Sequence, residues 1–254
     1  MSDTEVIIYE DQDYVVLNKQ PGVLTIPDRY DIFLPNLQQI LEAKYNKIFV
    51  VHRLDKETSG AIIFAKNELA HKEIVEQFFH RKVEKIYLGI TYGVIPIDED
   101  KINLPIGENK NDPQKVKIDF SEGKPSITEY KVLERFKNYT LIEAKPITGR
   151  RHQIRIHLAT IGYPLVADSL YSGKDKFFLS EIKINFKFKK NEPEKPIIQR
   201  TALHSYKISF YHFRKKQNIT VQAPLPKDFQ LLLKYLRKYN YTDIPTRGRN
   251  QAEK

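Results

Sequence analysis

The sequence contains no cysteine and no tryptophan, and its only methionine is the first residue. The absence of cysteine excludes a disulfide framework, a cysteine nucleophile and any cysteine-ligated zinc or iron–sulfur site. No apolar run reaches the length of a membrane span, and residues 1–11 are acidic and too poor in apolar residues for a signal peptide. We therefore expect a cytoplasmic protein with no membrane association.

Motifs for nucleotide, metal and hydrolase chemistry are also missing. The sequence has no P-loop and no GxGxxG, HExxH or GxSxG pattern. It has no internal repeat, low-complexity tract or interdomain linker, and 254 residues are enough for one large domain or two lobes. We expect no cofactor and no metal, and we take a monomer as the default.

The charge is strongly positive. There are 42 Lys and Arg residues against 32 Asp and Glu residues, which gives a formal net charge of +10. Such an excess favours a polyanionic partner through phosphate contacts and counterion release. General solubility or an AT-rich genome explains the same excess, so the charge only supports a nucleic-acid partner.

The stretch 50–66, VVHRLDKETSGAIIFAK, organises the chain. Asp55 lies between two basic residues, and a Thr-Ser-Gly turn then leads into the apolar run Ala61–Ala65, which is typical of a buried strand. Asp55 is therefore predicted in a loop carried by a sheet, where functional groups are often found. The alternative is an aspartate that only stabilises a tight turn.

A second polar stretch is predicted to be helical. Ile154, Leu158 and Ile161 recur at helical spacing, which predicts a helix over 151–161 with Thr148 near its start and Gly162 after its end. Arg155 would then share one face with Arg151, and such residues are most often solvated surface.

The remaining pattern mixes strands and helices. We expect hairpins at 6–18 and 126–145, helices at 35–45, 67–80 and 226–239, and strands at 61–65, 85–93, 114–120, 183–190, 204–213 and 217–223. The strand at 183–190 is lysine-rich and is typical of a sheet edge, where lysine also blocks aggregation.

Several blocks together resemble one enzyme family. His52–Gly60 resembles the HRLDxxTSG signature of the RluA family of pseudouridine synthases, and Lys85–Tyr87 resembles its second block. Gly149–His157 resembles the GRxHQIRxH signature, and Arg200–His204 matches a further block. Lys19–Gly22 keeps the lysine and glycine of a Lys-Pro-x-Gly block but displaces the proline by one position.

This resemblance implies a fold and a reaction. It implies an α+β pseudouridine synthase fold, with a mixed, largely antiparallel sheet, a central catalytic cleft and flanking helices. Residues 1–241 would form one catalytic domain and 242–254 a disordered tail. There is no room before Val6 for the small S4 domain of some relatives. The implied function is isomerisation of uridine to pseudouridine in structured RNA, either ribosomal large-subunit RNA or transfer RNA.

The resemblance also implies residue roles. Asp55 is the expected catalytic carboxylate, acting as nucleophile or base, and Arg155 is its expected ion-pair partner. Tyr87 would stack on the flipped base and Arg53 would fill the vacated stack, although a phosphate contact is an alternative for Arg53. Further substrate-binding candidates are His52, Thr58, Lys19, Arg150 and His152. A strand-ending lysine in water is the alternative for Lys19, and loop bracing is the alternative for His152.

Two other function classes compete with this one. A non-catalytic RNA-binding protein on the same scaffold would be signalled by loss of Asp55 or Arg155, and both are present. A glycosidase or nuclease would need a second carboxylate or a metal cluster beside Asp55, and Glu57 is too close in the loop. We rank the synthase first.

Overall fold

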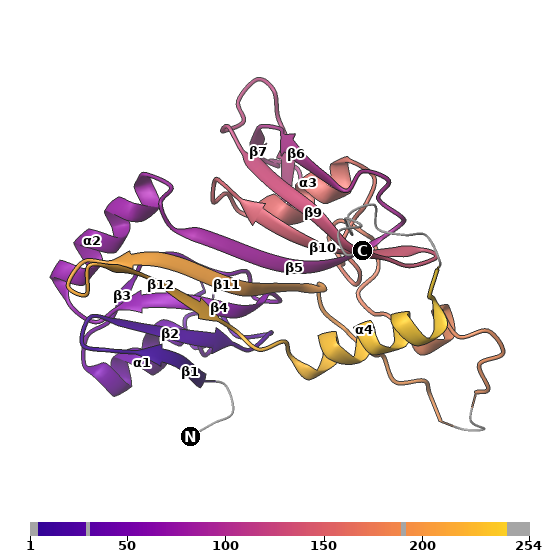
Figure 1. Cartoon of the computed structure of the whole chain (residues 1–254), viewed down its shortest axis with the longest axis horizontal. Helices are drawn as coiled ribbons and strands as arrows, with labels where there is room; N and C mark the ends of the chain where they lie inside the picture. The colour runs from indigo at the N-terminus through magenta and orange to yellow at the C-terminus, as the bar shows by residue number, and fades with distance from the viewer. Residues whose placement is uncertain (1–4, 29–30, 189–191, 243–254) are drawn as a thin grey trace, which may run out of the picture. The chain divides into compact units, whose positions relative to one another are not determined.

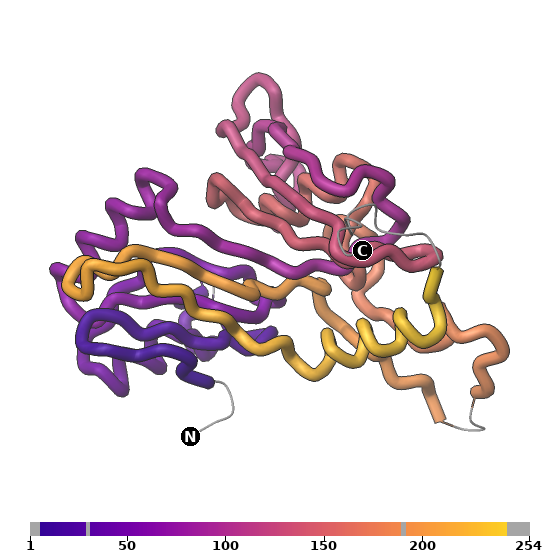
Figure 2. The backbone as a smooth tube through the Cα atoms, in the orientation of Figure 1, coloured from indigo at the N-terminus to yellow at the C-terminus, as the bar shows by residue number. Residues whose placement is uncertain are grey.

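The computed structural model describes residues 5–28, 31–188 and 192–242. Of the tail predicted to be disordered, residues 243–254 lie outside this part. The chain forms two compact units, one from Met1–Tyr87 with Leu203–Pro226 and the other from Leu88–Ala202 with Lys227–Lys254. Strand β5, Glu84–Tyr92, runs from the first unit into the second. The chain crosses between the units three times, and these crossings can be followed in Figure 2.

The first unit is built on a mixed sheet (Figure 1). Its strand order is β1-β2-β4-β11-β5, with β3 paired to β4 and β12 paired to β11. The other strands of this unit are β1 Glu5–Glu10, β2 Tyr14–Lys19, β3 Phe49–Val50, β4 Ser59–Ala65, β11 Leu203–His212 and β12 Gln217–Gln222. The β4–β11 pair is parallel, whereas β1–β2, β2–β4, β3–β4 and β11–β12 are antiparallel.

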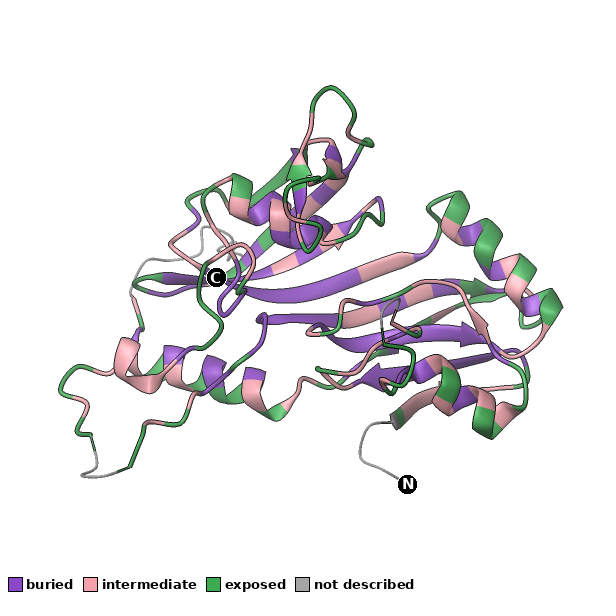
Figure 3. Ribbon diagram, turned by 180° about the vertical axis from the view of Figure 1, so that it is seen from behind, coloured by how far each residue is buried: buried purple, intermediate pink, exposed green. Residues whose placement is uncertain are grey.

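Strand β4 lies at the centre of this sheet because it has no polar face. All seven of its residues are buried, as the sequence predicts for the run ending in Ala-Ile-Ile-Phe-Ala (purple in Figure 3). Two helices complete the unit: α1, Leu37–Tyr45, and α2, Glu68–Phe79. The predicted cap of α2 is confirmed, since the Asn67 side chain accepts a hydrogen bond of 2.9 Å from the Ala70 amide.

The second unit has its own antiparallel strands and helices. The strand order is β5-β10-β9-β6, and β7 and β8 form a separate antiparallel pair. The bounds are β6 Glu99–Asn103, β7 Ile106–Glu108, β8 Val116–Ile118, β9 Ile127–Arg135, β10 Tyr139–Pro146, α3 Gln153–Thr160, the short 3-10 helix η1 Leu179–Glu181 and α4 Lys227–Tyr239. The predicted 126–145 hairpin and the apolar face of the last helix are confirmed.

The predicted helix at 151–161 is too long at its start. It begins at Gln153 because His152 has a φ of 53°, in the left-handed region. Arg151 therefore does not share a helical face with Arg155. Thr148 does not cap the helix either, since its hydroxyl binds the Gln153 side chain. Gly162 follows the helix end with a φ of 90°, as expected for that position.

Other strand assignments also differ from the sequence prediction. The predicted edge strand at 183–190 is wrong for its described part, since residues 183–188 form no strand. Alternation of lysine with apolar residues imitates a strand, but no partner strand is present there among the described residues. Strands β6 and β7 were not predicted. Only Ile102 of β6 is buried, so the strand carries little apolar pattern and is held by its pairing with β9.

The fold class is confirmed as α+β with a mixed, largely antiparallel sheet. Within the described ranges, no helix is long and apolar enough to cross a membrane.

Candidate active site

The loop that carries Asp55 is anchored at Leu54, the residue before it. The Thr25 hydroxyl donates to the Leu54 carbonyl at 3.1 Å and accepts from the Leu54 amide at 3.2 Å. The Thr58 amide then donates to the Asp55 carbonyl at 3.1 Å and closes a turn. Thr58 is buried and Asp55 is half-buried. The backbone therefore holds Asp55 at the start of a short, closed turn.

Lys19 fixes the loop on the other side. It is fully buried at the end of β2, and its ammonium group donates to the carbonyls of Gln20, Val23 and Lys56 at 3.0, 2.7 and 2.9 Å. The Gly22 amide donates to the same Lys56 carbonyl at 2.9 Å. The alternative of a strand-ending lysine in water is therefore wrong. Lys19 and Gly22 tie the residue after Asp55 to the segment that follows β2.

The parallel pairing of β4 with β11 brings the Arg200–His204 block beside this turn. Gly60 has a φ of 113°, and a Cβ atom there would lie 2.2 Å from the Ser205 carbonyl oxygen. The Ser59 hydroxyl lies 2.9 Å from His204 Nδ1, and His204 Nε2 lies 3.2 Å from the Ala223 carbonyl. Since a carbonyl only accepts, Nε2 carries the proton and Nδ1 accepts from Ser59. No role was predicted for His204 from the sequence.

Tyr87 lies in the same unit as Asp55, on β5, and is only 8% exposed. The Ser205 side chain lies near the Tyr87 hydroxyl group and donates to the Ala61 carbonyl at 2.9 Å. Burial and the nearby Asp55 charge both disfavour a phenolate and raise the Tyr87 pKa well above its usual value. Tyr87 is therefore a neutral phenol that lies within electrostatic reach of Asp55.

His52 and Arg53, the first two residues of the His52–Gly60 block, have different surroundings. The His52 ring stacks on Phe78 with centroids 5.0 Å apart, and its Nε2 accepts from the Ile63 amide at 3.2 Å. Burial, together with the charge of Lys85, lowers the His52 pKa to about 3, so the ring is neutral. Arg53, in contrast, is exposed. His52 thus supports the sheet, while Arg53 is accessible to a ligand.

In the second unit, Arg155 has a carboxylate partner that the sequence motifs did not reveal. Its Nε and Nη2 donate to the two oxygens of Asp168, each at 2.7 Å, and its guanidinium group lies 5.2 Å from the centre of the Tyr171 ring. Asp168 is fully buried and also accepts from the Leu170 amide. A signal was available in the Gly-x-Pro…Asp…Tyr pattern at 162–171, which places an acid and an aromatic residue shortly after the helix.

The residues just before α3 brace the loop that leads into it. The Gln153 side chain accepts from the Thr148 hydroxyl at 2.7 Å and from the Arg150 amide at 3.0 Å. His152 Nδ1 lies 3.0 Å from the Tyr171 hydroxyl. These contacts agree with the loop-bracing alternative for His152. The Arg150 side chain is exposed.

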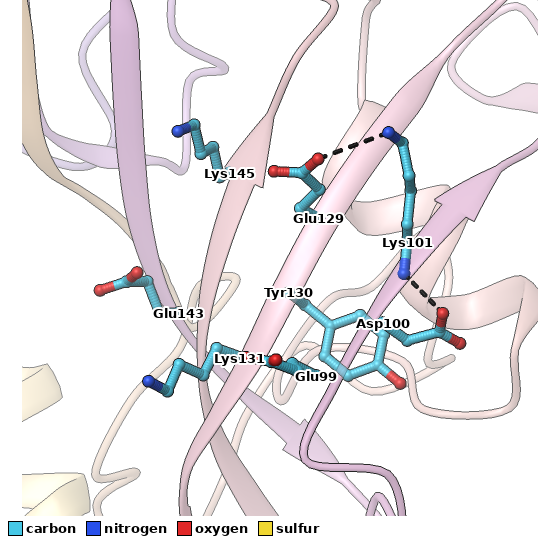
Figure 4. Close-up of a pocket in the computed structure, with 8 residues that line it drawn as sticks. All are labelled: Glu99, Asp100, Lys101, Glu129, Tyr130, Lys131, Glu143 and Lys145. Atoms are coloured by element: carbon cyan, nitrogen blue, oxygen red, sulfur yellow. Dashed lines mark hydrogen bonds and ion pairs between the residues drawn. The ribbon is translucent and has the colours of Figure 1, made fainter.

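A surface hollow in the second unit contains none of the predicted site residues (Figure 4). It has a volume of about 420 Å³ and is lined from β6, β9 and β10 by Glu99, Asp100, Lys101, Glu129, Tyr130, Lys131, Glu143 and Lys145. Lys101 lies 3.5 Å from Glu129, so the charges partly neutralise one another. Four acidic residues beside three lysines make this an unsuitable surface for a polyanion.

A cluster of titratable residues joins the β1–β2 turn to the β11–β12 turn. His212 Nε2 lies 2.7 Å from Asp11, Arg214 Nε lies 2.8 Å from Asp13, and Lys215 Nζ lies 2.8 Å from Asp11. These basic groups already surround the two carboxylates. We interpret the cluster as an ion-pair network that ties the two turns together.

The chain is similar to known RNA-modifying enzymes. The RNA pseudouridylate synthase family profile matches residues 13–160. The uncharacterised RNA pseudouridine synthase YlyB of Bacillus subtilis is 34% identical over 241 residues, which cover 91% of this chain and 73% of that protein. Ribosomal large subunit pseudouridine synthase D of Neisseria meningitidis is 34% identical over 91% of this chain, and the match spans 61% of its length. The dual-specificity RNA pseudouridine synthase RluA of Vibrio cholerae is 33% identical, with coverage of 86% and 82%.

Solved structures agree with these sequence matches. Human RNA pseudouridylate synthase domain containing 4 has a TM-score of 0.67 at 25% identity and covers 91% of this chain and 92% of its own. Human RNA pseudouridylate synthase domain containing 1 has a TM-score of 0.64 at 25% identity, with coverage of 94% and 97%. The sequence motifs, the family profile and the fold thus agree over most of the chain, which belongs to the RluA-type RNA pseudouridine synthases, a family of isomerases.

Proposed function

We propose that this protein converts one or more uridines of a structured RNA to pseudouridine, with Asp55 as the catalytic carboxylate. The observation that carries the proposal is the Asp55 turn. Leu54 and Lys56, on either side of Asp55, are each anchored by two hydrogen bonds, and the neutral Tyr87 lies within electrostatic reach. A rigidly held carboxylate within electrostatic reach of a buried aromatic ring suits a reaction on a flipped nucleoside.

The reaction is balanced without a co-reactant. The C1′–N1 bond of uridine breaks, the freed uracil turns, and C5 bonds to C1′. C5 then loses its hydrogen as a proton while N1 gains one, so substrate and product are isomers. Asp55 acts as a nucleophile or as a base on the sugar while the base is detached. One carboxylate is enough for either route, and the proposal needs no metal or cofactor.

We assign Arg155 as the ion-pair partner of Asp55 on the basis of the GRxHQIRxH motif. A nearby opposite charge offsets the cost of burying an ionised carboxylate in a desolvated site. A guanidinium group has five N–H donors, so an arginine oriented by one carboxylate retains the capacity to bind a second. In this proposal, Asp168 orients the Arg155 fork from behind.

The other predicted residues divide into two groups in this proposal. Tyr87 stacks on the extruded base, which is worth about 1–3 kcal/mol for an aromatic ring. The exposed Arg53 fills the vacated position, and Arg150 and His152 meet the RNA from the second unit. Lys19 and Thr58 contribute to substrate binding by holding the loop, and His52 contributes by supporting the sheet that carries it.

The names of the relatives and the net positive charge support the proposed substrate class and compartment. The named relatives act on ribosomal large-subunit RNA or carry a dual-specificity designation. With a net charge of +10, this protein is proposed to act on ribosomal large-subunit or transfer RNA in the cytoplasm, as a monomer whose residues 1–241 work as one catalytic domain.

Tritium release tests the reaction directly. RNA labelled with tritium at uridine C5, taken from cells that lack the gene, is incubated with wild-type protein, Asp55→Asn and the exposed control Asp175→Asn. We expect release by the wild type and the control, and none by Asp55→Asn despite normal RNA binding. RNA binding without release by any of the three, with ribosomal and transfer RNA both tried, would favour the binding-only alternative.

A further inference from the structure

The segment after η1 exposes aromatic and basic side chains together. Ile184 and Phe188 are 82% and 69% exposed, and Lys187 is also exposed. In Figures 1 and 3 the loop that contains this segment projects away from the strands of its own unit. An exposed phenylalanine side chain is costly in water, and here Phe188 follows the exposed Lys187 directly in the chain.

Local contacts give this segment a defined arrangement. The Lys183 amide donates to the Leu179 carbonyl at 2.9 Å, and the Phe186 amide donates to the Lys183 carbonyl at 3.2 Å. The Phe186 and Phe188 rings meet edge to face with centroids 5.0 Å apart. Lys183 Nζ lies 5.9 Å from the centre of the Phe186 ring and 5.5 Å from that of Tyr239. The segment is thereby connected to the end of α4.

The end of α4 also carries basic and aromatic side chains. Its last turn carries Arg237 and Lys238, and the Lys238 ammonium lies 5.1 Å from the centre of the Tyr239 ring. Residues 182–190 contain four lysines and no acidic residue, and the nearby Glu181 is paired with Lys174 at 2.7 Å. We call this surface the Lys/Phe patch, which comprises Lys183, Phe186, Lys187, Phe188, Lys238 and Tyr239.

We propose that the Lys/Phe patch binds an unpaired segment of the substrate RNA. This proposal rests on the proposed function, which supplies RNA as the substrate. Alternating rings and ammonium groups are the two elements that unpaired nucleic acid requires, since each base offers a face for stacking and each phosphate offers a counter-charge. A duplex conceals its base faces, so the exposed Phe188 ring selects for unpaired RNA.

Phe188→Ala tests the aromatic part. The probe is a fluorescein-labelled 12-nucleotide RNA of mixed sequence, used single-stranded and as a duplex with its complement, with binding to the full chain followed by anisotropy. The matched control is Phe120→Ala, a 79% exposed phenylalanine of the same unit. We expect Phe188→Ala to weaken single-strand binding about five- to tenfold and duplex binding less than twofold, and Phe120→Ala to change neither. Equal affinities for the two variants would overturn the proposal.

Lys183→Gln/Lys187→Gln tests the basic part. The slope of log affinity against log salt changes by about 0.7 for each phosphate that a protein no longer neutralises on a single strand. We therefore expect the double variant to reduce the slope by about 1.4. The control Lys101→Gln/Lys131→Gln removes the same charge from the acidic hollow of Figure 4 and should leave the slope unchanged. Equal slopes for the two double variants would overturn the proposal.

A lipid surface is the competing partner for exposed phenylalanine and lysine. Sedimentation with phosphatidylglycerol–phosphatidylcholine vesicles separates the two. Loss of vesicle binding in Phe188→Ala with unchanged RNA affinity would overturn the proposal, whereas a weaker RNA affinity without vesicle binding supports it. The binding assays need no catalysis, so a failure of tritium release counts against the proposed function and leaves this test interpretable.

Discussion

Gly60→Ala is the substitution whose effect the structure determines most sharply. Gly60 is the residue of β4 that pairs directly with Ser205 of β11, just after the Asp55 turn. Its φ of 113° disfavours any side chain, and the added Cβ would lie 2.2 Å from the Ser205 carbonyl oxygen. The backbone of Gly60 fixes the position of the added Cβ, and the Ser205 oxygen is itself a backbone atom. No side-chain rotation can therefore relieve the contact.

Two terms contribute to the expected cost. A positive φ costs a residue with a Cβ roughly 1–2 kcal/mol. Real Cβ contacts almost never fall below 3.0 Å, so the strands must separate by about 0.8 Å, the difference from 2.2 Å. Such a shift would break the buried Ser59–His204 hydrogen bond, whose loss costs about 1–3 kcal/mol. Together these terms predict a decrease of about 2–5 kcal/mol in the free energy of unfolding.

Urea denaturation of Gly60→Ala beside Gly22→Ala checks this value. Gly22 also has a positive φ, 83°, but a Cβ there would meet nothing within 4 Å. Gly22→Ala should therefore lose only the conformational part, about 1–2 kcal/mol. Gly60→Ala should also lose activity, since the displaced Ser205 lies near the Tyr87 hydroxyl group. Equal stabilities for the two variants would refute the close-approach argument.

Three further predictions follow from buried charges. Lys19→Met should lower the free energy of unfolding, measured in urea, by about 2–4 kcal/mol because three carbonyls lose their donor. The control Lys56→Met, at an exposed residue, should change this free energy by less than about 0.5 kcal/mol, and similar values for both variants would contradict the anchoring role of Lys19. Asp168→Asn should lower the free energy of unfolding by about 3–5 kcal/mol because it leaves Arg155 buried beside a neutral partner. Glu134→Gln breaks only the exposed pair with Arg237 and should lower it by less than about 1 kcal/mol. An equally small effect of Asp168→Asn would show that the buried pair is dispensable. Burial lowers the Lys85 pKa from 10.5 to about 8. Between pH 8 and pH 10.5 the unfolded chain therefore binds more protons at this residue than the folded protein, and the free energy of unfolding should rise with pH across that range. Urea midpoints should show the rise in wild type and a smaller one in Lys85→Met; identical pH profiles would contradict it.

Local sequence signals were sufficient where the interaction spans few residues. The apolar run of β4 predicts burial, Asn67 predicts the start of α2, and Gly162 marks the end of α3, because strand patterning and helix capping act within about one turn or one strand. The family motifs predict roles for Asp55, Tyr87 and Arg155 from short recognisable blocks, and these roles stay predictions.

Tertiary structure decided the features that depend on distant partners. Lys19 looks like a solvated strand end until the Lys56 carbonyl, 37 residues away, lies beside its ammonium group. Strand β6 exists because β9 pairs with it, and residues 183–188 form no strand although their pattern alternates. Asp168 becomes the Arg155 partner only when the loop after α3 folds back on the helix. Sequence pattern records what each residue prefers, but hydrogen bonds and ion pairs between distant segments depend on which groups folding brings within about 3 Å of one another.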